Sequence, residues 1–303
     1  MRPETRRRVE QAAESLGYIR NFAAGMLSSH ESKMIAVVVP NFANSIFATT
    51  LQEIGDGVRD QGYQLLVGCS DYSLEREEEL VRTFLSRGTD ALVLTGHLHS
   101  AASREMIINS HRPVVEMWSV GPDPLGISIG VSNYEAAIVA TRHLLSRGRR
   151  RIAYIGGDIE GNDRAQARVE GYRAALEAAG LPFDPWLVLT GPFEFDTGSW
   201  AVDELLRIEP GIDAIFAASD IIALGAVLHC NRSGIEVPGR IAICGFDDAR
   251  IAQVISPALT TIKFPKREIG RLVARNLLSL LSGETPADPM IEVGFSLVHR
   301  ETS

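Results

Sequence analysis

The stretch Met34–Val39 reads MIAVVV, an unbroken apolar run with the length of one strand. A strand with no polar side chain to face water must be covered on both sides, which is typical of the inner strands of a parallel sheet. Further apolar runs predict strands at Gln64–Gly68, Ala91–Leu94, Val114–Met117 and Ile127–Val131. The segments between them have helical period and predict helices at Phe47–Gln61, Leu74–Ser86 and Tyr134–Ser146.

The same alternation starts again in the second half of the chain. We expect strands at Arg151–Ile155, Trp186–Leu189, Ala214–Ala217 and Ile241–Cys244, and helices at Ala165–Ala179, Ser199–Arg207 and Asp220–Arg232. Strands that alternate with helices form doubly wound parallel sheets, which bind ligands at the carboxyl ends of their strands. The sequence therefore predicts an α/β protein of two such subdomains, with a binding cleft between them.

The charge distribution restricts the partners. A chain of 303 residues with a net charge of −8 does not favour nucleic-acid binding over its whole surface. The first 33 residues differ, because they hold six basic and four acidic side chains. A helix is expected to begin at Pro3 and to end at Gly17, and a short helical stretch at Phe22–Ser28 is expected to follow it. Any contact with DNA is thus expected in this segment.

The sequence lacks the motifs that are typical of several other classes of protein. The three cysteines, Cys69, Cys230 and Cys244, have neither zinc-site nor disulfide spacing and indicate core thiols in a reducing compartment. No secretion signal and no apolar run of membrane-spanning length occur, so we expect a cytoplasmic protein. No Gly-rich phosphate loop or catalytic motif is present, so we expect no enzyme and no cofactor. His97 and His99 have no third ligand nearby, so we expect no metal either.

Many motifs along the chain are collinear with those of one family. They include Pro3–Val9, Leu16–Tyr18, Val39–Asn41, Asn44–Phe47, Arg151–Gly157, Arg168–Tyr172, Ala217–Asp220, Ala223–Gly225, Gly245–Asp248 and Leu259–Ile262. The chain resembles the LacI/GalR family of bacterial transcription regulators over essentially its whole length. Pro113–Trp118, Ser132–Ala136, and Thr95–Gly96 with His99–Ser100 are most similar to the branch that represses gluconate operons.

The resemblance implies a periplasmic-binding-protein-like body with three crossovers between its subdomains, preceded by the last helix and hinge of a helix-turn-helix head. The implied limits are 1–33 for the head remnant and hinge, 34–131 plus 264–287 for the N-terminal subdomain, and 132–263 plus 288–303 for the C-terminal subdomain. Asn21, Ala24 and Leu27 match the hinge, which in the family inserts a Leu into the minor groove.

The resemblance also implies the partners. Family members are homodimers that bind operator DNA and a small effector, here a sugar or sugar acid. The helix-turn-helix pair of the head, which includes the recognition helix, is expected upstream of Met1, so this polypeptide alone is not expected to bind an operator specifically. A rival interpretation is the solute-binding protein of a sugar transporter, which has the same two-lobed cleft. That class needs export and has no use for a basic helix before the first strand.

The effector site is implied residue by residue. Phe47 and Phe193 match aromatic walls of the cleft, Arg168 matches an arginine that clamps the ligand, and Asp247 and either Ser219 or Asp220 match polar contacts. A sugar acid needs such a cation for its carboxylate and such acceptors for its hydroxyls.

Simpler interpretations of these residues stay open. Phe47 can equally be a core residue, as most phenylalanines are. Arg168 can equally lie on a solvated helix face together with Glu170 and Arg164. Asp247–Asp248 is placed to cap a helix. Asn133 is expected to cap the helix beginning at Tyr134 rather than to contact the ligand.

Overall fold

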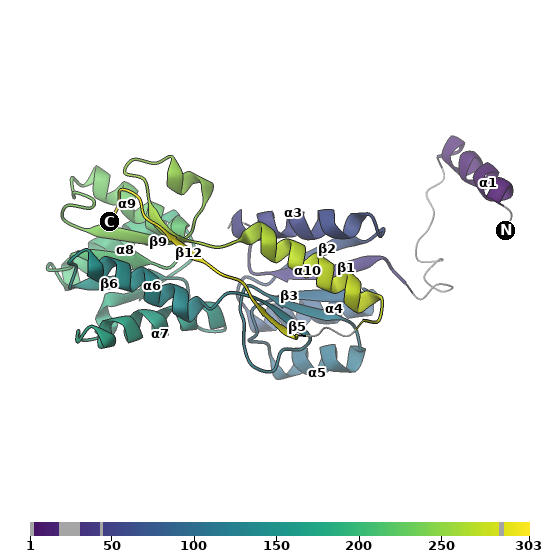
Figure 1. Ribbon diagram of the computed structural model, residues 1–303, viewed down its shortest axis with the longest axis horizontal. Helices are drawn as coiled ribbons and strands as arrows, with labels where there is room; N and C mark the ends of the chain where they lie inside the picture. Colours follow the sequence, from purple (N-terminus) through teal and green to yellow (C-terminus); the bar gives the residue numbers. More distant parts are fainter. Residues whose placement is uncertain (1–2, 18–30, 43–44, 285–287) are drawn as a thin grey trace.

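The computed structural model describes residues 3–17, 31–42, 45–284 and 288–303, and it shows two α/β lobes (Figure 1). We call them the N-terminal and the C-terminal lobe after the order of their first strands. Each lobe contains one six-stranded sheet with helices on both faces. The predicted fold class is therefore confirmed.

The sheet of the N-terminal lobe has the order β11-β5-β4-β3-β1-β2, and all its strands are parallel. Its strands are β1 (Met34–Val39), β2 (Gln64–Cys69), β3 (Ala91–Thr95), β4 (Val114–Met117), β5 (Ile127–Gly130) and β11 (Met290–Glu292). Helices α3 (Ser45–Arg59) and α10 (Lys266–Leu281) pack together on one face, and α4 (Leu74–Ser86) and α5 (Ala101–Ser110) cover the other. Ile35 and Val37 face the first pair, whereas Ala36 and Val38 face the second.

The sheet of the C-terminal lobe has the order β12-β10-β9-β8-β6-β7. Its strands are β6 (Ile152–Gly156), β7 (Val188–Thr190), β8 (Ala214–Ala217), β9 (Ala242–Asp247), β10 (Thr260–Lys263) and β12 (Ser296–Val298). Helices α6 (Asn133–Ser146) and α7 (Asp163–Ala178) cover one face, and α8 (Phe195–Ile208) and α9 (Asp220–Arg232) the other. The edge strand β12 runs antiparallel to β10, which departs from the expected all-parallel arrangement.

The chain passes between the lobes after β5, between β10 and α10, and between β11 and β12 (Figure 1). The last passage differs from the expected limits, which assigned 288–303 to the C-terminal subdomain. Met290–Glu292 forms β11 and pairs with β5 of the N-terminal lobe. The chain first extends that sheet by one edge strand and only then crosses.

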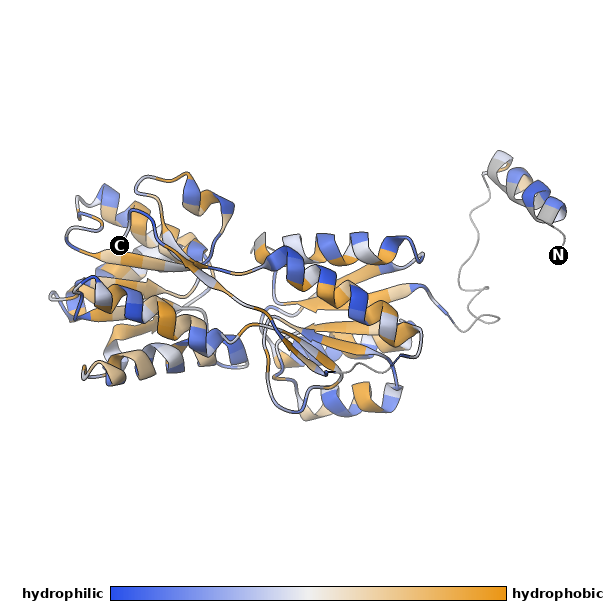
Figure 2. Ribbon diagram, viewed as in Figure 1, coloured by the Kyte–Doolittle hydropathy of each residue, from blue (hydrophilic) through white to orange (hydrophobic). Residues whose placement is uncertain are grey.

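Most expected strands and helices lie where the apolar runs placed them. Figure 2 shows why, because the strands are hydrophobic while the helices carry their hydrophilic residues on the outer side. An exception is the strand expected at Trp186–Leu189. Pro185–Leu187 forms a short 3-10 helix, η1, in which Asp184 accepts a hydrogen bond from the backbone N–H of Trp186, and Trp186 is 75% exposed. A proline at the first position favours this turn over a strand.

The N-terminal segment is described only in part. Helix α1 spans Pro3–Ser15, and Gly17 follows with a φ of +62°, as expected for a glycine that ends a helix. The hinge residues Asn21, Ala24 and Leu27, and the stretch Phe22–Ser28, lie outside the described residues. No helix in the described part of the chain is both long and apolar enough to cross a membrane.

Candidate functional site

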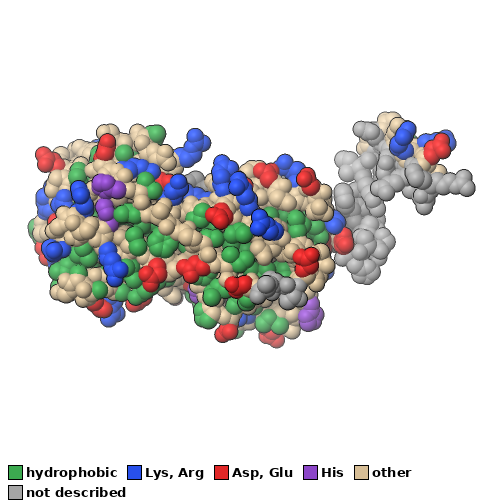
Figure 3. All heavy atoms as spheres, in the orientation of Figure 1, with side chains coloured by type: hydrophobic (Ala, Val, Ile, Leu, Met, Phe, Trp, Pro, Cys, Tyr) green, Lys and Arg blue, Asp and Glu red, His purple; other side chains and the backbone are tan. Residues whose placement is uncertain are grey.

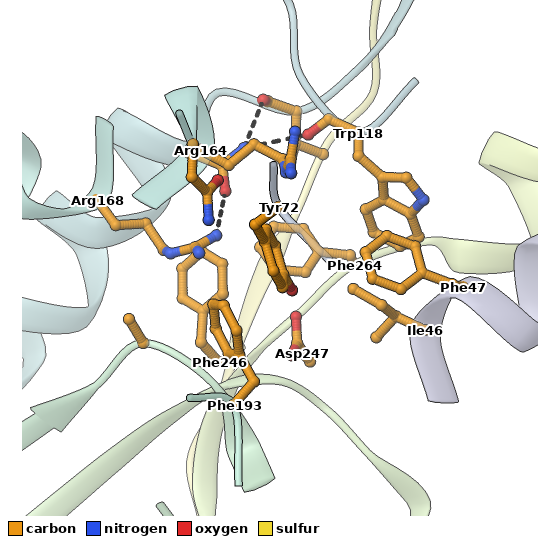
Figure 4. Close-up of a pocket in the computed structure, with 14 residues that line it drawn as sticks. Ile46, Phe47, Tyr72, Trp118, Arg164, Arg168, Phe193, Phe246, Asp247 and Phe264 are labelled. Carbon is orange, nitrogen blue, oxygen red and sulfur yellow. Dashed lines mark hydrogen bonds between the residues drawn. The ribbon is translucent and has the colours of Figure 1, made fainter. Parts of the chain in front are cut away.

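A pocket lies where the two lobes meet (Figure 4). It encloses about 430 Å³ of empty space, its open mouth included. The lining residues are Ile46, Phe47, Tyr72 and Trp118 from the N-terminal lobe, Val131, Asn133 and Phe264 from the crossovers, and Asn162, Arg164, Arg168, Phe193, Ala218, Phe246 and Asp247 from the C-terminal lobe. Of the residues expected in the site, Phe47, Arg168, Phe193 and Asp247 line this pocket.

Strand ends and strained backbone position the lining. Tyr72, Trp118 and Asp247 lie at or just after the carboxyl ends of β2, β4 and β9, and all three have positive φ angles, of 62°, 74° and 119°. Such a backbone costs on the order of 1–3 kcal/mol for each residue other than glycine and gathers at functional sites. Three of the non-glycine residues with positive φ in the described part of the chain therefore line this one pocket.

Arg168 is a buried cation at the pocket wall. It is 8% exposed, so the interpretation of a solvated helix face is wrong. Its Nη1 donates a hydrogen bond to Oδ1 of Asn133 at 2.8 Å, and its guanidinium lies 5.0 Å above the ring of Phe246 (Figure 4). Among the described residues no carboxylate lies within ion-pair distance of it. The hydroxyl of Tyr154 lies beside the guanidinium, but neither it nor Arg168 Nε makes a hydrogen bond of good geometry there.

Asn133 has a different role from the expected one. Ser132, and not Asn133, caps α6, because its hydroxyl accepts a hydrogen bond from the backbone N–H of Glu135. This leaves the Asn133 amide to donate to the carbonyl of Trp118 at 3.1 Å while it accepts from Arg168. A residue at the crossover therefore connects the N-terminal lobe to the cationic wall.

A second arginine, Arg164, lies one turn before Arg168 on α7 and also lines the pocket. Its Nη1 donates to Oδ1 of Asp163 at 2.9 Å. Oδ2 of the same carboxylate accepts from the backbone N–H of His97 and lies 2.9 Å from Nδ1 of its imidazole. Because His97 follows β3, this contact joins the two lobes.

Aromatic rings form much of the remaining surface. Tyr72 stacks on Phe193 across the two lobes at 5.0 Å between ring centroids, and burial raises the pKa of Tyr72 to about 12. Phe47 is both a core residue and a wall of the pocket, and it meets Trp118 edge-on at 6.1 Å. Flat apolar walls suit the carbon face of a sugar-like ligand, which leaves polar groups to recognise its hydroxyls.

Ser219 and Asp220 do not line the pocket, although the resemblance placed one of them there. Ser219 donates to Oδ2 of Asp247 at 3.4 Å. Asp220 accepts from the hydroxyl of Thr261 and from the backbone N–H of Ala249, both at 2.6 Å. Burial raises the pKa of Asp220 to about 6, partly offset by these two hydrogen bonds. Asp220 thus joins α9 to β10 and to the segment after β9.

Asp247 and Asp248 do not cap a helix. The short helix η2 (Arg250–Gln253) has Ala249 as its N-cap. Asp247 ends β9 at the pocket, and Asp248 forms an ion pair with Arg300 at 2.5 Å.

The two histidines considered as metal ligands point to different places. His97 contacts Asp163, whereas His99 is buried inside the N-terminal lobe, with Nδ1 2.6 Å from Glu77 and Nε2 3.3 Å from Glu116. Within the described ranges, no group of three or more His, Cys, Asp or Glu side chains is arranged to hold a metal ion.

Sequence reasoning missed several lining residues: Ile46, Tyr72, Trp118, Asn162, Arg164, Phe246 and Phe264. A signal existed for Arg164, because residues four apart share one face of a helix and Arg164 precedes Arg168 by one turn. Trp118, Phe246 and Phe264 lie at or next to strand ends, where a doubly wound sheet binds its ligand. Nothing in the local sequence distinguished these aromatic residues from core.

Comparison with known proteins gives a consistent result. A family model of the periplasmic binding protein-like domain matches residues 141–303. The HTH-type transcriptional regulator GntR of Pseudomonas aeruginosa is 38% identical over 99% of this chain and 87% of its own length, and GntR of Escherichia coli K12 is 33% identical over 96% and 87%.

Solved structures agree with these relatives. The transcription regulator GntR from Chromobacterium violaceum superimposes with a TM-score of 0.85 at 37% identity, covering 89% of this chain and 99% of that one. A LacI family regulator from Silicibacter pomeroyi gives a TM-score of 0.91 at 29% identity, covering 100% and 91%. Fold, cleft and whole-length relatives lead to the same conclusion: the chain belongs to the LacI family of transcriptional regulators.

Proposed function

We propose that this regulator binds a sugar acid of the gluconate type between its lobes, and that binding changes its affinity for operator DNA. The relatives named GntR support the choice of effector. The structure of a relative, the transcriptional regulator CelR, is a complex with cellobiose, which supports a sugar-like ligand in this fold. We further propose a cytoplasmic homodimer that acts as a repressor rather than as an enzyme.

The observation that carries the proposal is the buried guanidinium of Arg168. A buried charge is costly unless it is paired, and this cation has an amide and an aromatic ring beside it but no carboxylate. A carboxylate on the ligand would supply the missing partner in the geometry that a guanidinium prefers. A neutral sugar would leave the charge uncompensated.

The rest of the lining suits a polyol chain attached to that carboxylate. Asn162 and Asp247 offer polar atoms for hydroxyl groups, while Phe47, Trp118 and Phe193 offer apolar walls. Both lobes contribute to the lining, so a ligand that fills the pocket contacts the two lobes together. It therefore stabilises the arrangement in which they are close.

We propose that lobe closure couples effector binding to the affinity for operator DNA. In a symmetric dimer, a change in the angle between lobes moves the N-terminal lobes relative to each other and changes the spacing of the segments that precede them. We propose that the effector lowers operator affinity, so that it acts as an inducer. Fluorescence anisotropy of a labelled operator duplex, with and without gluconate and with a helix-turn-helix head joined to the N-terminus of this chain, tests this direction.

The central test is the Arg168→Ala variant in titration calorimetry with D-gluconate. Removing the clamp leaves the ligand carboxylate buried without a partner, so we expect affinity to fall by at least about a hundredfold, or roughly 3 kcal/mol. Arg173→Ala is the matched control, since Arg173 is an exposed arginine on the same helix, paired with Glu177. It should bind gluconate like the wild type.

The acid proposal fails if wild-type protein binds D-glucitol, the uncharged counterpart, as tightly as gluconate. It fails as well if Arg168→Ala keeps the wild-type affinity for gluconate.

A further inference from the structure

Asp163 is the first residue of α7, and its two carboxylate oxygens contact residues of different lobes. Oδ1 accepts from Arg164 at 2.9 Å within the C-terminal lobe. Oδ2 accepts from the backbone N–H of His97 at 3.1 Å and lies 2.9 Å from the imidazole Nδ1 of the same residue, in the N-terminal lobe. A single side chain thus contacts both a residue of the pocket wall and the opposite lobe.

The backbone of the N-terminal lobe is shaped for this contact. Gly96 has a φ of +88°, and a Cβ at that position would collide with the Arg164 guanidinium and the Asp163 carboxylate. Only glycine combines this backbone angle with so close an approach. The N-terminus of α7 therefore lies directly against the end of β3, and any opening of the lobes at this point must break the contact.

The carboxylate is charged in this arrangement. Asp163 is 7% exposed, and burial alone would raise the pKa of its carboxyl, but the Arg164 charge and the hydrogen bonds from His97 outweigh burial and hold the pKa well below its usual range. Arg164 is almost as buried, at 9%, whereas the His97 side chain is 34% exposed. His97 Nδ1 also lies 3.1 Å from the hydroxyl of Ser119, which orients the ring.

We propose that Asp163 and His97 are positioning residues that hold the two lobes together and fix Arg164 at the pocket wall, without touching the effector. The inference rests on the proposed function in one respect, namely that the cleft is where the effector binds. It adds that effector affinity depends on a contact between the lobes outside the ligand shell.

The contact affects effector affinity because it contributes to the free energy of lobe closure. When the lobes separate, His97 leaves the carboxylate, and Asp163 retains only its neighbour Arg164. A contact that exists only in the closed arrangement raises the population of that arrangement before the effector arrives. Apparent affinity scales with that population, so a weaker contact lowers the affinity for every ligand of the cleft by the same factor.

The experiment compares three substitutions in the full chain. His97→Ala removes the imidazole from a partly exposed loop position. His97→Asn keeps an N–H donor close to the position of Nδ1. Asp163→Asn removes the charge. The control is Asp203→Asn, which breaks a second His–Asp pair, Asp203 with His229 at 2.7 Å, that lies within the C-terminal lobe between α8 and α9.

Two measurements are made on each protein: the radius of gyration of the ligand-free form by small-angle X-ray scattering, and the affinity for D-gluconate by calorimetry. We expect His97→Ala and Asp163→Asn to enlarge the ligand-free protein and to weaken gluconate binding by about tenfold. His97→Asn and Asp203→Asn should match the wild type in both. A substitution that only disturbed the local structure would weaken gluconate binding without enlarging the ligand-free protein.

Two results overturn the inference. One is ligand-free scattering of His97→Ala that superimposes on that of the wild type. The other is a His97→Asn variant as weak in gluconate binding as His97→Ala. If wild-type protein does not bind gluconate, the proposed function fails, and the scattering of the ligand-free variants alone decides whether the contact holds the lobes together.

Discussion

The two lobes present different chemistry to the pocket they share. The N-terminal lobe contributes Ile46, Phe47, Tyr72 and Trp118, whose lining surface is largely apolar, whereas the C-terminal lobe contributes Asn162, Arg164, Arg168 and Asp247 beside its own aromatic rings. Apolar contact is nondirectional and indifferent to ligand charge, but a buried guanidinium discriminates strongly. We infer that the C-terminal lobe selects the ligand class and that the N-terminal lobe adds affinity.

The N-terminal lobe is not without buried charge, but that charge lies away from the cleft. His99 lies between Glu77 of α4 and Glu116 of β4, and all three side chains are buried. None of them lines the pocket. Figure 3 shows charged side chains of both signs over the outer surface of both lobes, so the contrast concerns what is buried. The buried charges of the N-terminal lobe thus lie away from the pocket, whereas Arg164, Arg168 and Asp247 of the C-terminal lobe line it.

The largest expected effect concerns the His99 cluster and the stability of the protein. Burial alone would lower the pKa of His99, but the hydrogen bonds to Glu116 and Glu77 raise it to about 9 from 6.5. A group whose pKa is raised on folding contributes stability below its unfolded pKa and loses it as the pH rises through the folded value. Wild-type protein should lose about 3 kcal/mol of unfolding free energy between these two pH values.

Urea titrations across that pH window check this prediction. The His99→Gln variant should be less stable at the lower pH and should show a flatter profile, while its gluconate affinity stays that of the wild type. His229→Gln, which breaks a more exposed His–Asp pair in the other lobe, should keep the wild-type slope. A large loss of gluconate affinity in His99→Gln would show that buried charge of the N-terminal lobe also affects effector binding.

The next effect concerns Asn133, which connects the lobes at the cationic wall. Asn133→Ala removes the acceptor of Arg168 and the donor to the Trp118 carbonyl. A hydrogen bond to a charged group contributes about 1.5–3 kcal/mol, so we expect gluconate affinity to fall by roughly thirtyfold. Asn231→Ala is the control, because Asn231 makes one comparable bond to the carbonyl of Ser256 on the exposed surface. Unchanged gluconate affinity in Asn133→Ala would show that Arg168 binds the ligand without being oriented by Asn133.

The fold was predictable because it rests on covered strands. MIAVVV at Met34–Val39, and in the second half the runs at Arg151–Ile155, Ala214–Ala217 and Ile241–Cys244, are almost entirely apolar, and each became an inner strand of a sheet. The exceptions are edges. Met290–Glu292 and Ser296–Val298 are short and partly exposed, so burial left little trace in their sequence, and their pairing depends on where the chain crosses between lobes.

The family motif alone placed Arg168 at the pocket, because its spacing left a solvated helix face equally open. Its burial beside Asn133 and Phe246 becomes visible only in three dimensions. Asn133 and Asp220 were harder, because an amide or a carboxylate beside a helix start serves equally as a cap, a brace or a ligand contact. Ser132 and Asp163 show the same ambiguity. Only the three-dimensional arrangement shows that one caps α6 and that the other reaches across the cleft.

The smallest effect separates two phenylalanines on opposite walls. Phe47 packs edge-on against the ring of Trp118, whereas Phe246 lies beneath the Arg168 guanidinium. Each substitution by leucine loses an aromatic contact of about 1 kcal/mol, so gluconate affinity should fall by roughly fivefold in both. Phe47→Leu should weaken gluconate and D-glucitol by the same factor in competition calorimetry, because an apolar wall does not sense charge. Phe246→Leu should weaken gluconate more, since the orientation of the cation changes as well. Equal discrimination by both variants would show that charge recognition extends over the whole pocket and is not confined to the C-terminal lobe.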